Sequence, residues 1–368
     1  MTNIAVFGTG IDAQTIAADL TLSGHQVNIL GLPEQKNKIE YIKNNGIYLH
    51  GDETVSGKTG LTKINIVTTD CKEALQNVEV IIFANPSSDY EYRIKLIAPY
   101  LGEGQIINFN TYGYWPSLRI TEYLKETGKN DVILTESPAP IYWSGGKDGN
   151  VIINFLRKNV PLAAFPAIKN KEAFNVLKKI FPQFEIAKNV LQTNLENVNL
   201  LVHPAIILLN IGWFDRAEII GESVGFYKTG NTVHTGIFQE LLDKERLKIC
   251  EAYKVRALPI NKCINNLYGA QGKNMYEITK NCTAYQKMNE IPPKTWITWT
   301  LDDVPLALVP AAHLADVAGV SVPLLKGVIN ILGSLIEKDF WETGLTLERL
   351  GLNISLQEIT KYVFTGKK

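Results

Sequence analysis

The spacing of hydrophobic residues changes character about halfway along the chain. Up to residue 193, short apolar runs of strand length alternate with segments of helical periodicity. Beyond residue 193, long segments with helical periodicity take over. The pattern predicts an α/β fold class: a Rossmann-type, doubly wound sheet domain over residues 1–193, followed by an all-helical domain over residues 194–368.

The first strand-like run, residues 4–7, leads into Gly8-Thr9-Gly10 and then into a helical segment. A second strand-like run follows at residues 27–30, so the order is that of one βαβ unit. In such a unit the first glycine permits a tight turn, and the second lets the backbone approach a pyrophosphate. Ala13 takes the third position, where a small residue packs the helix on the strand. The N–H groups at the helix N-terminus then attract the phosphates.

This turn predicts dinucleotide binding, and a glycine turn without a ligand is the alternative reading. Further strand-like runs at residues 78–88 and 104–115 end in loops. Loops at the carboxyl ends of the strands line the ligand crevice of a doubly wound sheet. The same polar and proline residues also occur in ordinary turns. The residues that we expect to border the cofactor are Gly8, Thr9, Gly10, Ile11, Ala13, Gly31, Asn85, Pro86 and Asn110.

The end of the second predicted strand bears on the choice of cofactor. NAD sites usually carry an acidic residue there, which accepts a hydrogen bond from the ribose 2′-OH. This chain has Gly31, so no acid would repel a 2′-phosphate. Lys36 and Lys38 follow and could reach such a phosphate, although Glu34 could still serve a ribose. We therefore expect NAD(P)H, and the pattern favours NADPH.

The second half contains five long segments of helical periodicity, several of them apolar almost all round, as is typical of central helices in a bundle. Polar residues interrupt the longest candidate region, so no membrane span is predicted. The segments are residues 196–220, 234–253, 260–272, 303–320 and 322–342.

One titratable ring, His203, lies within the first of these apolar segments and precedes Pro204. The proline is typical of an N-terminal or kinked part of a helix. A buried imidazole needs polar partners, and Asp302 or Asp303 is the candidate, although an acid in this position could instead cap a helix. A carboxylate on one ring nitrogen would leave the other nitrogen for a substrate, in a cleft between the domains. A satisfied core histidine is the alternative.

Composition narrows the function classes further. Lys and Arg together number 37, as do Asp and Glu, so the balanced charge gives no electrostatic reason to expect nucleic acid or an anionic membrane as a partner. The cysteines are widely spread, which favours free thiols in a reducing compartment, and no signal segment opens the chain. We expect a cytoplasmic protein.

The histidines show no metal-ligand spacing, so no metal is expected. Exposed apolar area on the helical domain could support a homodimer.

Several stretches resemble the octopine/nopaline (opine) dehydrogenase family, which includes the N-(1-carboxyalkyl)amino-acid dehydrogenases. The resemblance covers nearly the whole chain. The stretches that carry it include the glycine turn, "LPEQKNKIEYIKNNGIYL", "VPLAAFPA", "ENVNLLVHPAIILLN", "FYKTGNT", "DKERLKICEAY", "LYGAQGKNMYE", "DDVPLALVP" and "TLERLGL".

The resemblance implies a reductive condensation, in which the amine of an amino acid or a related amine meets a 2-keto acid and a nicotinamide hydride reduces the imine. The family's catalytic histidine falls on His203 and its partner aspartate on Asp303. Two other functions stay open: reduction of a keto acid or imine without condensation, and a catalytically silent dinucleotide-binding protein.

One departure from the family concerns the substrate. The family usually has an arginine five residues before the aspartate, where it grips a substrate carboxylate, and this chain has Thr298. The hydroxyl group of a threonine cannot replace the charged guanidinium group of an arginine, which binds a carboxylate through two hydrogen bonds. The neighbouring Trp299 could favour an apolar substrate part, although packing is the commoner role of tryptophan. Arg216 could supply the missing charge. The predicted substrate residues are therefore Thr298, Trp299 and Asn210.

Overall fold

The chain divides into two compact units. Unit 1 comprises Met1–Val190 and Phe364–Gly366, and unit 2 comprises Leu191–Val363 and Lys367–Lys368. The computed structural model describes residues 1–110, 112–256, 258–288 and 290–368. The fold class is the predicted one: a Rossmann-type α/β unit precedes a helical unit. The boundary predicted between residues 193 and 194 falls within a short helix, and a few residues near the C-terminus belong to unit 1.

An eight-stranded sheet forms the centre of unit 1, with the strand order β12-β11-β8-β7-β6-β1-β2-β5. All neighbouring strands run parallel except β11 and β8, which are antiparallel. The strand order reverses direction between β1 and β6, and such a switch point is where ligands bind in open α/β sheets. The strands are β1 Asn3–Phe7, β2 Gln26–Leu30, β5 Ile66–Thr68, β6 Val80–Phe83, β7 Ile106–Phe109, β8 Ile133–Glu136, β11 Val160–Phe165 and β12 Phe184–Ile186.

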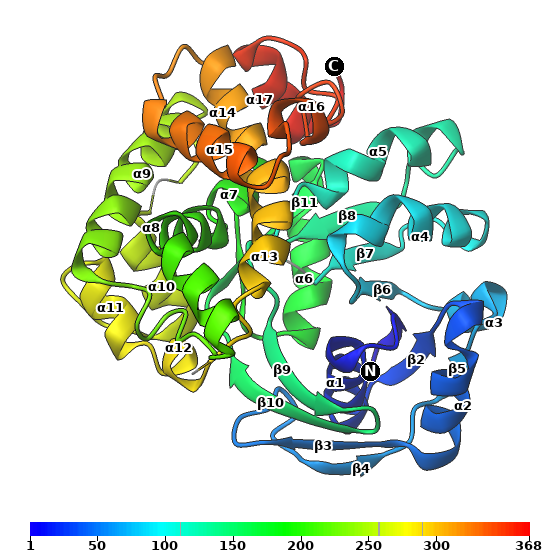
Figure 1. The fold of residues 1–368 in the computed structure, drawn as a ribbon. Helices are drawn as coiled ribbons and strands as arrows, with labels where there is room; N and C mark the ends of the chain where they lie inside the picture. The colour runs from blue at the N-terminus through cyan, green and yellow to red at the C-terminus, as the bar shows by residue number, and fades with distance from the viewer. Residues whose placement is uncertain (111, 257, 289) are drawn as a thin grey trace. The chain divides into compact units, whose positions relative to one another are not determined.

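Helices connect these strands, as Figure 1 shows. Apolar residues of α3, α4 and α5 pack with one face of the strands in a single core cluster. Phe83 lies at its centre, with its ring centroid 5.0 Å from that of Phe109 and 5.4 Å from that of Phe7. Strands buried on both faces explain the nearly continuous apolar runs in the sequence. The helices of unit 1 are α1 Ile11–Leu22, α2 Lys36–Asn45, α3 Cys71–Leu75, α4 Tyr90–Ile97, α5 Pro116–Glu126 and α6 Asn170–Ile180.

A second, four-stranded sheet was not expected from the sequence. Its order is β4-β3-β10-β9, and β3 pairs with β10 across about a hundred residues of chain, since Tyr48 lies opposite Asn150. Residues 131–144 include β8 of the first sheet and the start of β9 of the second. The strands of the second sheet are β3 Ile47–Gly51, β4 Gly60–Thr62, β9 Tyr142–Lys147 and β10 Asn150–Leu156.

Two buried polar residues of α1 connect that helix to the second sheet. Gln14 donates to Asp148 and accepts a hydrogen bond from the Gly149 N–H. The Asp19 carboxylate accepts from the Val55 N–H and from the Tyr142 hydroxyl. Burial and this carboxylate raise the pKa of the Tyr142 hydroxyl well above its usual value. The contacts satisfy polar groups that would otherwise be costly to bury, and they hold α1 between the two sheets.

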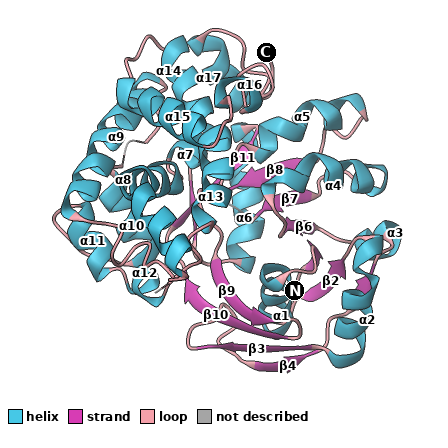
Figure 2. Ribbon diagram, in the orientation of Figure 1, coloured by secondary structure: helices cyan, strands magenta, loops and turns pink. Residues whose placement is uncertain are grey.

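The regular elements among the described residues of unit 2 are helices, drawn in cyan in Figure 2, and one isolated bridge joins Val224 and Ile291. A five-residue π-helical segment, Val304–Leu308, continues α13 into α14. The helices from α7 onward are α7 Val190–Leu195, α8 Asn199–Ile220, α9 Val233–Ala252, α10 Ile260–Tyr268, α11 Met275–Asn281, α12 Thr283–Lys287, α13 Thr295–Asp303, α14 Val309–Val317, α15 Pro323–Leu335, α16 Phe340–Thr343 and α17 Leu356–Thr365.

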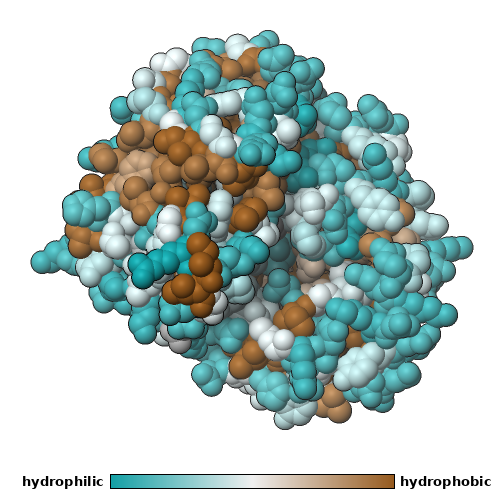
Figure 3. Space-filling model, viewed as in Figure 1, coloured by the Kyte–Doolittle hydropathy of each residue, from teal (hydrophilic) through white to brown (hydrophobic). Residues whose placement is uncertain are grey.

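The apolar segment around α8 is the central helix of unit 2. The stretch Val190–Ile220 is long and apolar enough to cross a membrane, but 67% of its most apolar window is buried inside the protein. Contacts with α9, α13 and α15 account for this burial, as expected for a core helix. Apolar side chains also gather on the surface near α15 (Figure 3), where Ile331 and Leu335 are about half exposed.

Candidate active site

The turn between β1 and α1 has the geometry that the glycine pattern predicts. Gly8 has φ +144°, and a Cβ there would lie 2.7 Å from the Ala84 carbonyl oxygen and 2.9 Å from Asn85 Oδ1. The same Cβ would also meet that of Ala13, which is fully buried. Gly8 and Ala13 are thus small because strand and helix approach closely. The space in front of Gly10 is open, since a Cβ there would meet nothing within 4 Å.

The start of α1 offers hydrogen-bond donors for an anion. Gly10 is the N-cap residue, and there is no side-chain capping hydrogen bond at this end of the helix. Thr9 is buried, and its Oγ1 has no hydrogen-bond partner within the described residues. Ile11 begins the helix and is partly exposed. The backbone N–H groups at a helix N-terminus, next to the open space at Gly10, fit a pyrophosphate.

The other residues predicted to border the cofactor follow strands of the same sheet. Asn85 follows β6 and donates to the Phe7 carbonyl oxygen at 2.5 Å, so it joins the ends of two neighbouring strands. Pro86 is exposed beside it. Asn110 directly follows β7, and its Oδ1 accepts from the Ile141 N–H at 3.3 Å. The carboxyl ends of parallel neighbours lie at one edge of a sheet, so these residues belong to the edge that carries Gly8.

Gly31 is a glycine for reasons of packing. A Cβ there would lie 2.8 Å from Ile39 Cδ1 and 2.9 Å from Thr9 Cγ2. An acidic side chain at this position would require the Ile39 and Thr9 side chains to shift. Both lysines that could contact a 2′-phosphate have acidic partners: Lys38 lies 3.2 Å from Asp148, and exposed Lys36 lies 3.8 Å from Glu40.

In unit 2, a hydrogen-bonded pair forms around His203. His203 lies in the second turn of α8, beside Pro204, so the proline is in the N-terminal part of the helix as predicted. Its Nδ1 lies 2.8 Å from Asp303 Oδ2, and both side chains are buried. A carboxylate only accepts hydrogen bonds, so Nδ1 carries the proton and Nε2 is the basic nitrogen of the neutral ring. The prediction that these residues lie together is confirmed in unit 2.

A third residue, Tyr227, was not identified from the sequence. Its hydroxyl lies 2.7 Å from His203 Nε2, and the side chain is buried. The imidazole is thus hydrogen-bonded at both nitrogens, as a buried imidazole requires. The only sequence signal was that Tyr227 lies within the "FYKTGNT" stretch that resembles the family.

Aromatic rings surround the imidazole on its remaining sides. Trp299 stacks on His203 with centroids 4.4 Å apart and an interplanar angle of 15°. Phe226 meets it edge-on at 5.6 Å. These rings exclude water and lower the local dielectric constant, which strengthens the charge interaction with Asp303.

The acid of this pair lies within a continuous helical run. Asp303 is the last residue of α13, and the π-helical segment follows directly. Its side chain makes no capping hydrogen bond there, so the capping alternative is wrong for Asp303. Pro305 has no N–H to continue the α-helical pattern, and π-helical segments frequently occur at functional sites.

The neighbouring acid, Asp302, has a different environment. Burial and the adjacent charge of Asp303 raise the pKa of Asp302 to about 6. No hydrogen bond or ion pair of Asp302 is present among the described residues. The pattern of residues left the choice between the two acids open and the resemblance pointed to Asp303, whose carboxylate is the partner of the imidazole.

The predicted substrate residues divide into two groups. Trp299 lies against the His203 ring, and Thr298 is exposed next to it on α13. Asn210 donates from Nδ2 to the carbonyl oxygens of Ile206 and Gly230, at 2.7 and 2.9 Å. The first bond stays within α8 and the second connects the helix to the segment that carries Tyr227, so the geometry favours a structural role for Asn210.

The geometry gives no support to Arg216 as the source of the charge that is missing at Thr298. Both residues lie on α8, thirteen positions apart, which corresponds to about 20 Å along an α-helix. That separation exceeds the reach of an arginine side chain. Arg216 is exposed in the last part of the helix.

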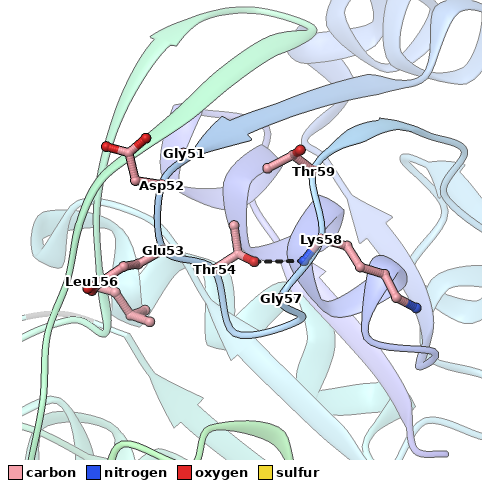
Figure 4. A pocket seen from close by; sticks show the side chains of 8 residues that line it. All are labelled: Gly51, Asp52, Glu53, Thr54, Gly57, Lys58, Thr59 and Leu156. Carbon is pink, nitrogen blue, oxygen red and sulfur yellow. Dashed lines mark hydrogen bonds between the residues drawn. The ribbon is translucent and has the colours of Figure 1, made fainter.

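A separate hollow of about 550 Å³ lies in unit 1, beside the loop between β3 and β4 (Figure 4). Its wall includes Asp52, Glu53 and Lys58. The Lys58 ammonium donates to the Leu22 carbonyl oxygen, at 3.2 Å. The hollow contains none of the residues predicted for the cofactor or the chemistry. Within the described residues, no group of three or more His, Cys, Asp or Glu residues could hold a metal ion.

Comparisons with known proteins agree with both halves of this description. Residues 186–336 match the family described as NAD/NADP octopine/nopaline dehydrogenase, alpha-helical domain. Residues 4–135 match the family described as ketopantoate reductase PanE/ApbA. An opine dehydrogenase of Arthrobacter sp. (strain 1C) is 29% identical over 350 residues, which cover 95% of each chain.

Two solved structures share the fold over the full length. An octopine dehydrogenase in complex with NADH and agmatine superposes with a TM-score of 0.80 at 18% identity, covering 100% of this chain and 99% of that one. A yersinopine dehydrogenase with bound NADP+ gives a TM-score of 0.71 at 13% identity, covering 99% and 98%. The resemblance stated from the sequence is therefore confirmed: the helical part of the chain matches the octopine/nopaline dehydrogenase family, and the protein is an NAD(P)-dependent oxidoreductase.

Proposed function

We propose that the protein catalyses an NAD(P)H-dependent reductive condensation of a 2-keto acid with the amine of an amino acid or a related amine, giving a secondary amine. The observation that carries the proposal is the buried pair of His203 and Asp303, with Nδ1 and Oδ2 2.8 Å apart, in the helical domain that matches the family. The glycine turn of unit 1, whose geometry fits a dinucleotide, supports it independently.

The acid–base chemistry of this reaction suits an imidazole. The amine arrives mainly as an ammonium ion and must lose a proton before it attacks the keto carbon. The hydroxyl group of the resulting carbinolamine must gain a proton to leave as water. His203 can accept the first proton and return the second, while Asp303 stabilises the imidazolium between the two steps. The protonated ring also stabilises negative charge that develops on the carbonyl oxygen.

The residues of unit 1 supply the cofactor site. The Gly8–Ala13 turn and the free N–H groups of α1 would hold the pyrophosphate, with Gly31, Asn85, Pro86 and Asn110 at the bordering loops. A bound nicotinamide provides the hydride that reduces the imine. The proposal also requires the reacting carbon of the imine to lie close to the nicotinamide C4 when both are bound, a distance that a co-crystal structure with the oxidised cofactor and the product would measure.

We favour NADPH over NADH, because nothing acidic follows β2 at Gly31. The ion pairs of Lys36 and Lys38 weaken that preference, since each lysine would have to leave its acid to bind a 2′-phosphate. Titration of the protein with each cofactor measures the ratio of the two Kd values. Replacing both lysines with alanine should raise the Kd for NADPH and leave that for NADH unchanged.

The decisive experiment is a substrate screen. The purified protein is mixed with NADH or NADPH, a 2-keto acid such as pyruvate or glyoxylate, and a panel of amino acids and amines. Oxidation of the cofactor is followed, and the product is identified by mass spectrometry. A secondary amine that contains both substrates supports the proposal; a folded protein that turns over no pair argues strongly against it.

A second candidate is reduction of a keto acid or an imine without condensation. Thr298 favours it, because the family usually has an arginine at this position. Without that arginine, one group that would bind a substrate carboxylate is lost. The match of residues 4–135 to the ketopantoate reductases points the same way. Cofactor oxidation that needs the keto acid alone, with no amine, would select this candidate.

A homodimer stays a prediction. Its most suitable surface is the apolar one on α15, where Ile331 and Leu335 are about half exposed. Light scattering coupled to size-exclusion chromatography measures the mass directly.

A further inference from the structure

The hydroxyl of Tyr227 occupies the ring nitrogen on which the proposed chemistry depends. With Asp303 on Nδ1, Nε2 is the nitrogen that exchanges a proton with a substrate, and the Tyr227 hydroxyl lies 2.7 Å from it. In the neutral ring Nε2 is an acceptor, so the tyrosine donates. In the imidazolium Nε2–H is a donor, so the tyrosine oxygen accepts and its own hydrogen turns elsewhere. The direction of this hydrogen bond therefore follows the charge of the ring.

The hydroxyl is held in place by its surroundings. The ring of Tyr227 stacks on that of Tyr285, with centroids 4.1 Å apart and an interplanar angle of 4°. The preceding residue, Phe226, is fully buried. A substrate that displaced the hydroxyl from Nε2 would have to break this stack and move a buried side chain.

The backbone around Tyr227 is equally constrained. The N–H groups of Thr229 and Gly230 both donate to the Gly225 carbonyl oxygen, at 2.8 and 3.0 Å. The Gly230 carbonyl oxygen accepts from the Asn210 amide at 2.9 Å. Gly230 also has no room for a side chain, since a Cβ there would lie 2.5 Å from the Phe226 carbonyl oxygen. Relay of a proton through the hydroxyl is thus favoured over displacement of the hydroxyl.

We propose that Tyr227 is the third member of a proton relay with Asp303 and His203, and that its hydroxyl exchanges the proton with the substrate. This inference rests on the proposed function. When the substrate ammonium loses its proton, the tyrosine oxygen takes that proton and passes its own to Nε2. When the carbinolamine loses water, Nε2–H returns a proton to the tyrosine oxygen, and the tyrosine O–H protonates the leaving hydroxyl. Tyrosine and imidazole both end neutral, and one water molecule is released.

The test compares Tyr227→Phe with the wild type. The variant keeps the stacked ring and removes only the hydroxyl, so we expect kcat/KM for the keto acid to fall about 100-fold, the contribution typical of a positioned acid–base group. The Kd of the cofactor should stay unchanged. Tyr285→Phe is the matched control, since it removes a hydroxyl from the other ring of the stack; its kcat/KM should change less than about threefold.

Proton inventories separate a relay from a structural role. In mixtures of H₂O and D₂O, kcat/KM of the wild type should show a curved dependence on deuterium fraction, because two protons move together through Tyr227 and His203. Tyr227→Phe should show a linear one. A variant that keeps nearly full activity and the curved dependence would overturn the proposal.

A gentler substitution covers the case in which Tyr227→Phe does not fold, which circular dichroism would reveal. Incorporation of 3,5-difluorotyrosine at position 227 lowers the pKa of the hydroxyl with little change in shape. A relay hydroxyl should then move the alkaline limb of the kcat/KM profile to lower pH, whereas an unmoved limb would contradict the relay. Failure of the proposed function is distinguishable, because the wild type itself would then turn over no substrate pair.

Discussion

The two units bring their functional residues together in different ways. In unit 1 the turn between β1 and α1 is one short segment, and its two glycines and Ala13 are near neighbours in the sequence. In unit 2 the hydrogen-bonded side chains come from α8, from the segment before α9 and from α13, and His203 and Asp303 are 100 positions apart. A cofactor turn is therefore a local property of the chain, whereas the acid–base pair depends on how the helices pack. Substitutions in the two regions should have separable effects.

The largest separable effect is expected for His203→Ala. Loss of the imidazole removes the acid–base group, so kcat should fall about 1000-fold, within the range for such groups. The Kd of the cofactor, measured by quenching of protein fluorescence, should change little, because the cofactor turn lies in unit 1. Equal losses in kcat and in cofactor affinity would instead indicate a structural histidine.

Asp303→Asn should have the next largest effect. The amide keeps the size of the side chain but cannot stabilise an imidazolium as a carboxylate does, so kcat should fall about 100-fold. The adjacent Asp302→Asn provides the control, since Asp302 makes no described hydrogen bond to the ring. If both substitutions lowered kcat equally, the hydrogen bond from His203 Nδ1 to Asp303 would not be the cause of the loss.

Gly8→Ala tests the other unit. The added methyl group would meet the Ala84 carbonyl oxygen at 2.7 Å, and φ +144° is unfavourable for alanine, so the turn must shift. We expect the Kd of the cofactor to rise about tenfold, through the loss of an N–H contact to the pyrophosphate worth about 1.5 kcal/mol. At saturating cofactor, kcat should stay near that of the wild type. Gly24→Ala, with φ +91° but open space around it, controls for backbone strain alone.

The same contrast explains how much the sequence could predict. The strands β1, β2, β6 and β7 and the glycine turn followed from local periodicity, because each element is a continuous run. The second sheet did not follow, because its strands are short and Tyr48 pairs with Asn150, far along the chain. Periodicity carries no information on which distant strands meet.

The candidate site divides along the same line. Spacing marked His203 as unusual, because a titratable ring in an apolar segment needs a partner, but the pairing with Asp303 came from a family resemblance. Tyr227 was missed, since a tyrosine in an irregular segment between two helices has no distinguishing pattern. The suggestion about Arg216 gains no support, because helix geometry separates it from His203 by about 20 Å.

Thr298→Arg should sharpen the substrate preference of unit 2. A guanidinium at this position could grip a keto-acid carboxylate as the resemblance implies, and a charged hydrogen bond of about 1.5 kcal/mol corresponds to about a tenfold lower KM. Asp302 lies four residues on along α13 and would compete for the new cation. The full effect should therefore appear in the double variant with Asp302→Asn. An unchanged KM in both would mean that this face of α13 does not meet the carboxylate.

The smallest effect concerns the stability of unit 2 and its dependence on pH. Burial and the charge of Asp303 raise the pKa of Asp302 to about 6, so the folded state binds the proton of this carboxyl more tightly than the unfolded state. The stabilisation that comes with the bound proton is complete below the unfolded pKa and is lost as the pH rises through about 6. Asp302→Asn removes this dependence of the folding stability on pH.

After allowance for the partial exposure of Asp302, the variant should be more stable than the wild type by about 1 kcal/mol at pH 8, with no difference at pH 4. Urea unfolding followed by the fluorescence of Trp296 and Trp299 measures this, and a variant less stable at pH 8 would show that the Asp302 carboxylate has a favourable partner.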